Sequence, residues 1–366
     1  MGVYERKARI LRPTIEPGRR VLVVSDIHAN LPYFHGVLDK VGFSDEDLLI
    51  LNGDFLEKGR ESLKTLHEVM AMCKKGNVIP LMGNCDDWAA MYREDSRWSR
   101  GIPHYMAYRK SGLLWEMTLE LGEDPMHITD FEGWKRRLAE RFPEEFAFLD
   151  ALPHGLETDK YIFVHAAMYP DKPLGAHRTG ELVRCDAFYE SDYVFDKWVV
   201  VGHYPVVLYG QNIVCANPII DRERHIVSID GGCVLKDDGQ LNCLIIPDIT
   251  ADEITFDAYD PFPVRRVLSD QAASPRSYYI RWGDSRVQVL RRGKEFSRCR
   301  HVRTGYEMDI LTKYLFEPGE FTDCNDCTDY VLPLKAGDLV SVVEETSRGY
   351  FVKHKGVSGW YFGELE

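Results

Sequence analysis

One ten-residue segment constrains the fold of this chain more than any other: Val21-Leu-Val-Val-Ser-Asp-Ile-His-Ala-Asn30. A continuous apolar run such as its first four residues is typical of a strand buried on both faces in an α/β protein. Because side chains alternate along an extended backbone, we expect Asp26 and His28 on the same side of the chain where the strand ends. The segment therefore predicts a carboxylate–imidazole pair, suited to a metal ion, at the sheet edge where α/β proteins bind ligands.

The same pattern, an apolar run followed by polar side chains, recurs downstream. Amphipathic helices are predicted over about 31–42 and 63–73, and their alternation with the runs indicates βαβ units and a largely parallel sheet. A stretch rich in Trp, Arg, Glu and Met, about 92–150, predicts a helical insertion with helices around 105–121 and 131–149. The apolar runs that end in polar residues are 21–24, 48–51, 78–81, 161–164 and 198–201.

Two carboxylates, three imidazoles and one amide stand at the ends of these runs. They are Asp26, His28, Asp54, Asn84, His165 and His203. This set can hold two divalent ions with Asp54 bridging, and mixed oxygen and nitrogen ligation suits Mn, Fe or Zn. Two such ions ~3.5–4 Å apart polarise a phosphoryl group and activate water for in-line attack. The alternative is that these are capping and turn residues of an ordinary α/β domain. It can account for any one of them, but not readily for six at the ends of five strands.

The blocks around these residues resemble those of calcineurin-like metallophosphoesterases, and the pattern is most similar to bacterial phosphatases of the phosphoprotein (PPP) type. Pro205 stands where related phosphodiesterases usually have a further metal-binding histidine, which favours the phosphatase pattern. The resemblance covers about residues 20–247. Its blocks are Ser25-Asp-Ile-His28, Gly53-Asp54-Phe-Leu-Glu-Lys-Gly59, Gly83-Asn84-Cys-Asp86, Val164-His165-Ala and Gly202-His203-Tyr-Pro205.

This resemblance implies an α/β metallophosphoesterase fold, with two facing mixed β-sheets flanked by helices in an α/β/β/α sandwich. It also implies a dinuclear metal site at the sheet edge. Asp26, His28 and Asp54 would hold one ion. The second ion would be held by Asp54 as well, together with Asn84, His165 and His203.

The chain departs from the PPP pattern at the residues that would assist the leaving group. Glu57 and Lys58 stand where the family usually has Asp-Arg, and Cys85 replaces the usual histidine. A thiol with an ordinary pKa of ~8.5 donates a proton poorly near neutral pH, so Asp86 or Asp87 is the next candidate for the acid. Glu57 could orient a partner, and Lys58 can contact phosphate as a point charge. The catalytic candidates are Glu57, Lys58, Cys85, Asp86 and Arg184.

Arg184, in Leu182-Val-Arg-Cys-Asp-Ala-Phe188, resembles the second phosphate-binding arginine of bacterial members, and a salt bridge on a helix surface is the alternative. Four histidines outside the motifs are expected at the surface or in packing contacts. They are His104, His127, His154 and His177. Cys324-x-x-Cys327 resembles half of a zinc site, and a pair of free thiols is the alternative we favour.

Composition narrows the class of protein. The formal net charge of −13 argues against nucleic acid as the main partner, although residues 276–303 are locally basic and could bind phosphate or form a solvated face. Nine cysteines without a signal peptide indicate reduced thiols and a cytoplasmic location. No apolar run approaches the ~18 residues of a membrane span, so no membrane partner is expected.

Three parts are predicted along the chain. Residues 1–250 form the metallophosphoesterase domain, 251–275 a linker or edge segment, and 276–366 a β-rich C-terminal region. Within that region, about 328–366 is SH3-like, because Gly337-Asp-Leu-Val-Ser-Val-Val343 and Gly359-Trp-Tyr361 resemble parts of such a barrel. A peptide would be the partner of an SH3-like region.

These patterns predict an enzyme, a phosphatase that hydrolyses phosphomonoesters by attack of a metal-bound hydroxide. Two divalent ions would be its cofactors, Mn first and Fe or Zn next, and a serine/threonine phosphoprotein is one candidate substrate. A nucleotide or dinucleoside polyphosphate hydrolase would share every metal ligand and is the alternative enzyme. A binding protein that acts through its SH3-like region is the third hypothesis, and the retention of all six metal ligands argues against it.

Overall fold

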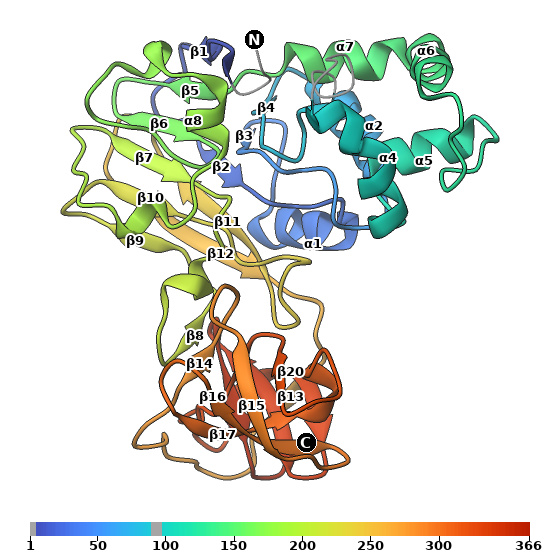
Figure 1. Ribbon diagram of the computed structural model, residues 1–366. Helices are drawn as coiled ribbons and strands as arrows, with labels where there is room; N and C mark the ends of the chain where they lie inside the picture. The colour runs from blue at the N-terminus through green and yellow to red at the C-terminus, as the bar shows by residue number, and fades with distance from the viewer. Residues whose placement is uncertain (1–4, 89–96) are drawn as a thin grey trace. The chain divides into compact units, whose positions relative to one another are not determined.

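The computed structural model describes residues 5–88 and 97–366, with the side chains of 97–100 left aside (Figure 1). The chain divides into two compact units. The first comprises Met1–Pro205, Pro218–Leu235 and Gly239–Asp260. The second comprises Val206–Asn217, Lys236–Asp238 and Pro261–Glu366. Both units are therefore discontinuous in sequence.

The first unit contains two mixed β-sheets, of orders β12-β11-β2-β3-β4 and β1-β5-β6-β7-β10-β9. The first sheet consists of β12 (Thr255–Tyr259), β11 (Leu241–Ile246), β2 (Val21–Val24), β3 (Leu48–Leu51) and β4 (Val78–Pro80). The second consists of β1 (Ile10–Leu11), β5 (Gly155–Glu157), β6 (Tyr161–Val164), β7 (Trp198–Val201), β10 (Ile226–Ser228) and β9 (Ile219–Asp221). Strands β2, β3 and β4 run parallel, as do β6, β7 and β10. The predicted α/β metallophosphoesterase fold is confirmed.

The apolar runs are continuous because both faces of their strands are buried. Leu22 and Val24 of β2 pack in the cluster beneath α1 and α2, whereas Val21 and Val23 pack against residues of β6 and β7. The opposite face of the second sheet forms a third cluster, which includes Val164 and several residues of the 174–195 segment. The two sheets thus face each other, and helices or loops cover their outer faces.

The helices of the first unit include α1 (Leu31–Val41), α2 (Ser62–Cys73), α4 (Arg97–Arg109), α5 (Leu113–Glu120), α6 (Phe131–Arg141), α7 (Pro143–Ala151) and α8 (Thr179–Val183). The helices of the insertion lie beside α2 in Figure 1, and α2 contacts both α5 and α7. The single helix expected over 105–121 is wrong. It is broken between α4 and α5, where Lys110 and Gly112 have φ of 52° and 107°. The helix expected over 131–149 is likewise divided, with Pro143 beginning α7.

The second unit consists mostly of antiparallel strands. Its larger sheet has the order β13-β20-β21-β22-β8, with β13 (Val264–Arg266), β20 (Leu339–Thr346), β21 (Gly349–His354), β22 (Val357–Tyr361) and β8 (Val214–Cys215). A second sheet contains β17 (Glu307–Leu311), β16 (Phe296–His301), β15 (Arg286–Arg291) and β18 (Phe321–Asp323), and β14 (Tyr279–Ile280) pairs with β19 (Cys327–Thr328).

Two strands of the larger sheet, β8 and β13, come from outside the predicted SH3-like range of 328–366. The predicted linker or edge segment, 251–275, is divided between the units, since β12 forms the edge of the first sheet and β13 pairs with β20. The mostly-β C-terminal region is confirmed, and its SH3 likeness stays a prediction. No helix among the described residues has the length and apolar character needed to cross a membrane.

Candidate metal centre

The loops that follow β2, β3, β4, β6 and β7 bring the six predicted metal ligands together. Asp26 Oδ1 lies 3.8 Å from His28 Nε2. His165 Nε2 lies 3.2 Å from Asn84 Oδ1, and its ring centroid is 5.1 Å from that of His203. Most of these side chains are almost fully buried, which is uncommon for charged groups unless they are paired or coordinate a metal.

Asp54 lies between two sets of ligand atoms. Its Oδ2 is 4.0 Å from His28 Nε2, and its Oδ1 is 3.3 Å from His165 Nε2. Gly83 allows this close approach, because a Cβ at that position would lie 2.1 Å from Asp54 Oδ1. One carboxylate therefore faces histidines on both sides, as a bridging ligand must.

The backbone at the site is not extended. Asp26, His28, Asp54 and His203 have φ between 51° and 68°, so β2 ends at Val24 and the chain turns directly afterwards. The expectation that alternation along an extended strand would align Asp26 with His28 is wrong; a turn brings them together instead. Residues in this region of φ cost of order 1–3 kcal/mol each and tend to cluster at functional sites.

Hydrogen bonds orient the ligand atoms. His165 Nδ1 lies 3.0 Å from the Asn52 carbonyl oxygen, to which it can only donate, so in the neutral ring the lone pair that can bind a metal is on Nε2. His28 Nδ1 likewise lies within hydrogen-bond distance of a carbonyl oxygen, that of Leu56, at 3.4 Å. Asp26 Oδ2 accepts hydrogen bonds from the Ser25 hydroxyl at 2.5 Å and from the His203 backbone N–H at 2.9 Å. Asp26 Oδ1 is buried and accepts none from the part of the chain that the structure describes.

The buried charges influence one another strongly. Burial raises the pKa of Asp26 well above its usual range and lowers the pKa of His28 to about 4 and of His203 to about 3. Burial alone would raise the pKa of Asp54, but His165 and His28 hold it far below its usual range. Burial alone would lower the pKa of His165, but Asp54 raises it to about 10. The low pKa values of His28 and His203, and an Asp26 oxygen that accepts no hydrogen bond from any described residue, fit a site that holds cations.

A model of the calcineurin-like phosphoesterase family matches residues 19–222 of the sequence. The chain belongs to this family. The family is dinuclear and metal-dependent. Among the chain's described residues, two groups of side chains have ligand atoms that all lie within 4.8 Å of one another. One group is His28, Asp54 and Cys85, and the other is Asp54, His165 and His203.

Several solved structures are similar to this family member. A protein provisionally named a diadenosine tetraphosphatase is 17% identical, with coverage of 69% of this chain and 99% of that chain, at a TM-score of 0.44. A serine/threonine phosphatase from Saccharomyces cerevisiae is 11% identical, with coverage of 71% and 86%, at 0.42. A metallophosphoesterase from Sphaerobacter thermophilus is 17% identical, with coverage of 66% and 89%, at 0.38. No curated protein sequence matches the chain.

Glu57 faces the helical insertion. Its Oε1 accepts a hydrogen bond from the Leu113 backbone N–H at 2.7 Å, and its Oε2 accepts one from the Tyr105 hydroxyl at 3.0 Å. A Cβ at Gly112 would lie 2.4 Å from Glu57 Oε2, which explains the glycine at the break between α4 and α5. Burial raises the pKa of Glu57 to about 7. Both carboxylate oxygens are thus engaged by residues that no sequence motif indicated.

Lys58 follows with φ of 66°, and Arg109 Nη2 donates to its carbonyl oxygen at 3.2 Å. Burial lowers the pKa of His28 most, and the negative charge of Asp54 opposes that shift. The positive charge of Lys58 lowers the pKa of His28 further, so the Lys58 ammonium influences the site. Arg184, directly after α8, is exposed and has a similar influence on the pKa of His203.

Asp86 and Asp87 have structural partners. Asp86 is buried and accepts backbone N–H groups from Asp54 at 2.7 Å, Gly83 at 2.9 Å and Leu56 at 3.0 Å. Asp87 accepts from the Arg6 guanidinium at 2.6 Å. Asp86 therefore joins the loops that carry Asp54 and Asn84, and burial together with the nearby Asp54 charge raises its pKa to about 8.

Asp186, two residues after Arg184 and not among the predicted site residues, stands beside the site. Its Oδ1 is 3.6 Å from His203 Nε2, and its side chain is 72% exposed. Of the four histidines outside the motifs, His104 and His127 are exposed, and His154 and His177 are buried. His154 accepts a hydrogen bond from the Arg9 N–H at 3.2 Å, and His177 accepts one from the Tyr169 N–H at 3.0 Å.

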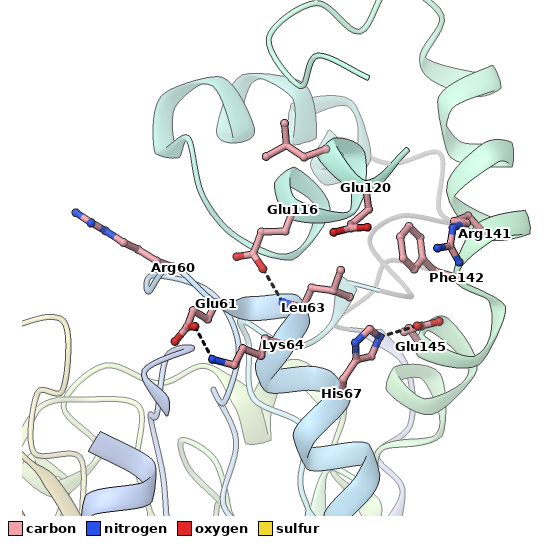
Figure 2. A pocket seen from close by; sticks show the side chains of 11 residues that line it. Arg60, Glu61, Leu63, Lys64, His67, Glu116, Glu120, Arg141, Phe142 and Glu145 are labelled. Carbon is pink, nitrogen blue, oxygen red and sulfur yellow. Dashed lines mark hydrogen bonds and ion pairs between the residues drawn. The ribbon is translucent and has the colours of Figure 1, made fainter. Parts of the chain in front are cut away.

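A cavity of about 530 Å³ lies between α2 and the helices of the insertion (Figure 2). Two ion pairs lie in its lining, since His67 Nε2 is 2.8 Å from Glu145 Oε1 and Lys64 Nζ is 2.8 Å from Glu61 Oε1. Glu116 accepts from the first backbone N–H groups of α2. None of the six predicted metal ligands lines this cavity, and its lining has more Glu than Lys and Arg side chains, so it offers no positive surplus for a phosphate.

Proposed function

We propose that this chain hydrolyses phosphate esters with two divalent metal ions held by the six predicted ligands. One ion would be held by Asp26, His28 and Asp54, and the other by Asp54, Asn84, His165 and His203. The observation that carries the proposal is Asp54, whose two oxygens face His28 and His165 separately. Asp26 Oδ1, which has no hydrogen-bond partner among the residues described, supports it, since a buried acceptor left unsatisfied costs about 1–3 kcal/mol.

When bound, two such ions neutralise charge on a phosphoryl group and lower the pKa of water. The residues of this chain contribute orientation and positive charge. The carbonyl oxygens of Asn52 and Leu56 hold the His165 and His28 rings with Nε2 toward Asp54. Asp86 fixes the loops after β3 and β4. Lys58 and Arg184 supply positive charge for a substrate phosphate.

The substrate class that we propose is a phosphomonoester, with serine/threonine phosphoproteins among the candidates. Nucleotide or dinucleoside polyphosphate hydrolysis is the alternative, because it would use the same ligands. We expect Mn to support turnover and retain Fe and Zn as the other candidates. A cytoplasmic location, PPP-type kinship and a peptide partner for the C-terminal region stay predictions.

The test is an assay of the purified full chain, stripped with a chelator and reloaded separately with Mn²⁺, Fe²⁺ or Zn²⁺. Each form is offered an aryl phosphate, phosphopeptides, mononucleotides and a dinucleoside polyphosphate. We expect hydrolysis of monoesters that disappears on chelation and returns on reloading. Two bound ions per chain without hydrolysis of any of these esters would overturn the proposal, and preference for the dinucleoside compound would favour the alternative.

A further inference from the structure

Cys85 lies among the ligand atoms of the first ion. Its Sγ, one ring nitrogen of His28 and one carboxylate oxygen of Asp54 all lie within 4.8 Å of one another. Ligands of one Zn²⁺ bond at ~2.0–2.3 Å, so their atoms stand roughly 3–4 Å apart, and a small adjustment would close the set. In the described residues, Asp26 does not belong to this compact set, although its Oδ1 is 3.8 Å from His28 Nε2.

The position of Cys85 is fixed by its neighbours. Its backbone N–H donates to Asp54 Oδ1 at 2.8 Å, and the amide of Asn84 donates to its Sγ at 3.4 Å. The residue is 8% exposed. Asp26 Oδ1 is buried and has no hydrogen-bond partner within residues 5–88 and 97–366, which independently supports a cation beside His28.

We propose that Cys85 is a direct ligand, through its sulfur, of the ion held by Asp26, His28 and Asp54. This inference rests on the dinuclear site proposed above and adds a soft donor to one half of it. When the ion binds, the S–H bond breaks, a metal–sulfur bond forms, and the proton passes to solvent. Cys85 then has no proton for a leaving group, and its role is to hold and select the metal.

A sulfur ligand changes the metal preference of one ion only. Thiolate favours Zn²⁺ and related softer ions over Mn²⁺, whereas the set with Asn84, His165 and His203 offers only oxygen and nitrogen. The two halves of the site should therefore differ in affinity when Zn²⁺ and Mn²⁺ compete. Replacement of Cys85 by Ser should weaken Zn²⁺ retention by at least the roughly 10–100-fold that loss of outer-sphere contacts costs, and Mn²⁺ retention much less.

The experiment loads the full chain with Co²⁺ and records the near-ultraviolet band of sulfur-to-cobalt charge transfer. We expect the band in the wild type and in Cys233→Ser, a nearby buried thiol whose Sγ donates to the Ile27 carbonyl at 3.8 Å. We expect its loss in Cys85→Ser with visible Co²⁺ bands retained. A wild type with two bound Co²⁺ ions and no such band, or a band unchanged by Cys85→Ser, would overturn the inference.

A second measurement requires no variant. X-ray absorption of the Zn²⁺-loaded wild type should show a sulfur scatterer at about 2.3 Å, and a shell of oxygen and nitrogen alone would overturn the inference. Failure of the proposed function is distinguishable: a sulfur signature without phosphate-ester hydrolysis would leave Cys85 as a ligand and reject the enzyme. Failure to bind any divalent ion would reject both.

Discussion

The metal-binding half of the proposed site and the half that would assist the leaving group are fixed by different parts of the fold. The metal ligands follow parallel strands whose ends share one edge of the sheets, and each ligand stands a few residues from its own strand. Glu57 and Lys58 are instead held by the insertion, where Tyr105 and Leu113 lie 48 and 56 residues away in sequence. The first half agrees with the family pattern, and the second departs from it.

The largest effect should come from the residue that unites the metal-binding half. In Asp54→Asn, the neutral amide cannot serve two cations, so we expect turnover to fall by on the order of 10⁴-fold or more, equivalent to several kcal/mol of metal-ion stabilisation. Metal analysis should show weaker retention of both ions. Asp45→Asn, at an exposed position where Asp45 pairs with Lys75 at 2.9 Å, is the matched control and should behave as wild type. Two retained ions with near-native turnover in Asp54→Asn would break the assignment.

The second prediction concerns the leaving group. No imidazole stands at position 85 and Asp86 is engaged by three backbone N–H groups, so the leaving oxygen must depart without general acid help worth ~10²–10⁴-fold. Aryl phosphates should therefore be hydrolysed faster than alkyl phosphates by a factor in that range. Equal kcat/KM for p-nitrophenyl phosphate and a phosphoserine peptide would show that another group supplies the proton, and the exposed Asp186, 3.6 Å from His203, would be the next candidate.

The variant Cys85→His tests whether an imidazole at position 85 can supply the missing proton. A new imidazole requires an orienting carboxylate, and both oxygens of Glu57 are already occupied by Leu113 and Tyr105. We therefore expect the variant to recover little of the alkyl rate. Recovery by 100-fold or more would show that Glu57 can leave the insertion and orient the ring.

The difference between the halves also explains how far the sequence could be interpreted. The sheets were predictable, and so was the meeting of the six predicted ligand residues, because each apolar run leads into one or two of these residues and parallel strands place such ends together. The turn at Asp26 was not, since its φ of 57° depends on tertiary hydrogen bonds such as that from its N–H to the Gly53 carbonyl at 3.1 Å. The break before α5 and the contribution of β8 to the C-terminal sheet also depend on contacts distant in sequence, which no local pattern records.

A third prediction uses the buried Glu57 carboxyl. Its pKa is raised from about 4.5 to about 7, so between these values the folded protein binds more protons than the unfolded chain. The contribution of Glu57 to the free energy of unfolding is fully present below pH 4.5. As the pH rises toward 7 that contribution is lost, and the free energy of unfolding falls by about 3 kcal/mol. Glu57→Gln should remove this loss, so that denaturant unfolding shows the variant gaining stability over wild type from pH 5 to 8. Glu120→Gln, at an exposed site, should show no such trend, and parallel pH profiles for Glu57→Gln and wild type would contradict the prediction.

The smallest effect tests whether the insertion positions the loop that carries Lys58. Tyr105→Phe removes one hydrogen bond to Glu57 and leaves the Leu113 contact, so we expect a loss of about 1–2 kcal/mol in stability and up to about tenfold in kcat. Metal content should be unchanged, because Tyr105 contacts no predicted ligand among its described interactions. Tyr108→Phe, whose tyrosine is 80% exposed, is the matched control on the same helix. If both variants equal wild type in stability and kcat, the insertion covers Glu57 without positioning it. If Tyr105→Phe loses metal, the insertion also influences the metal ligands, and the two halves of the site are not fixed independently.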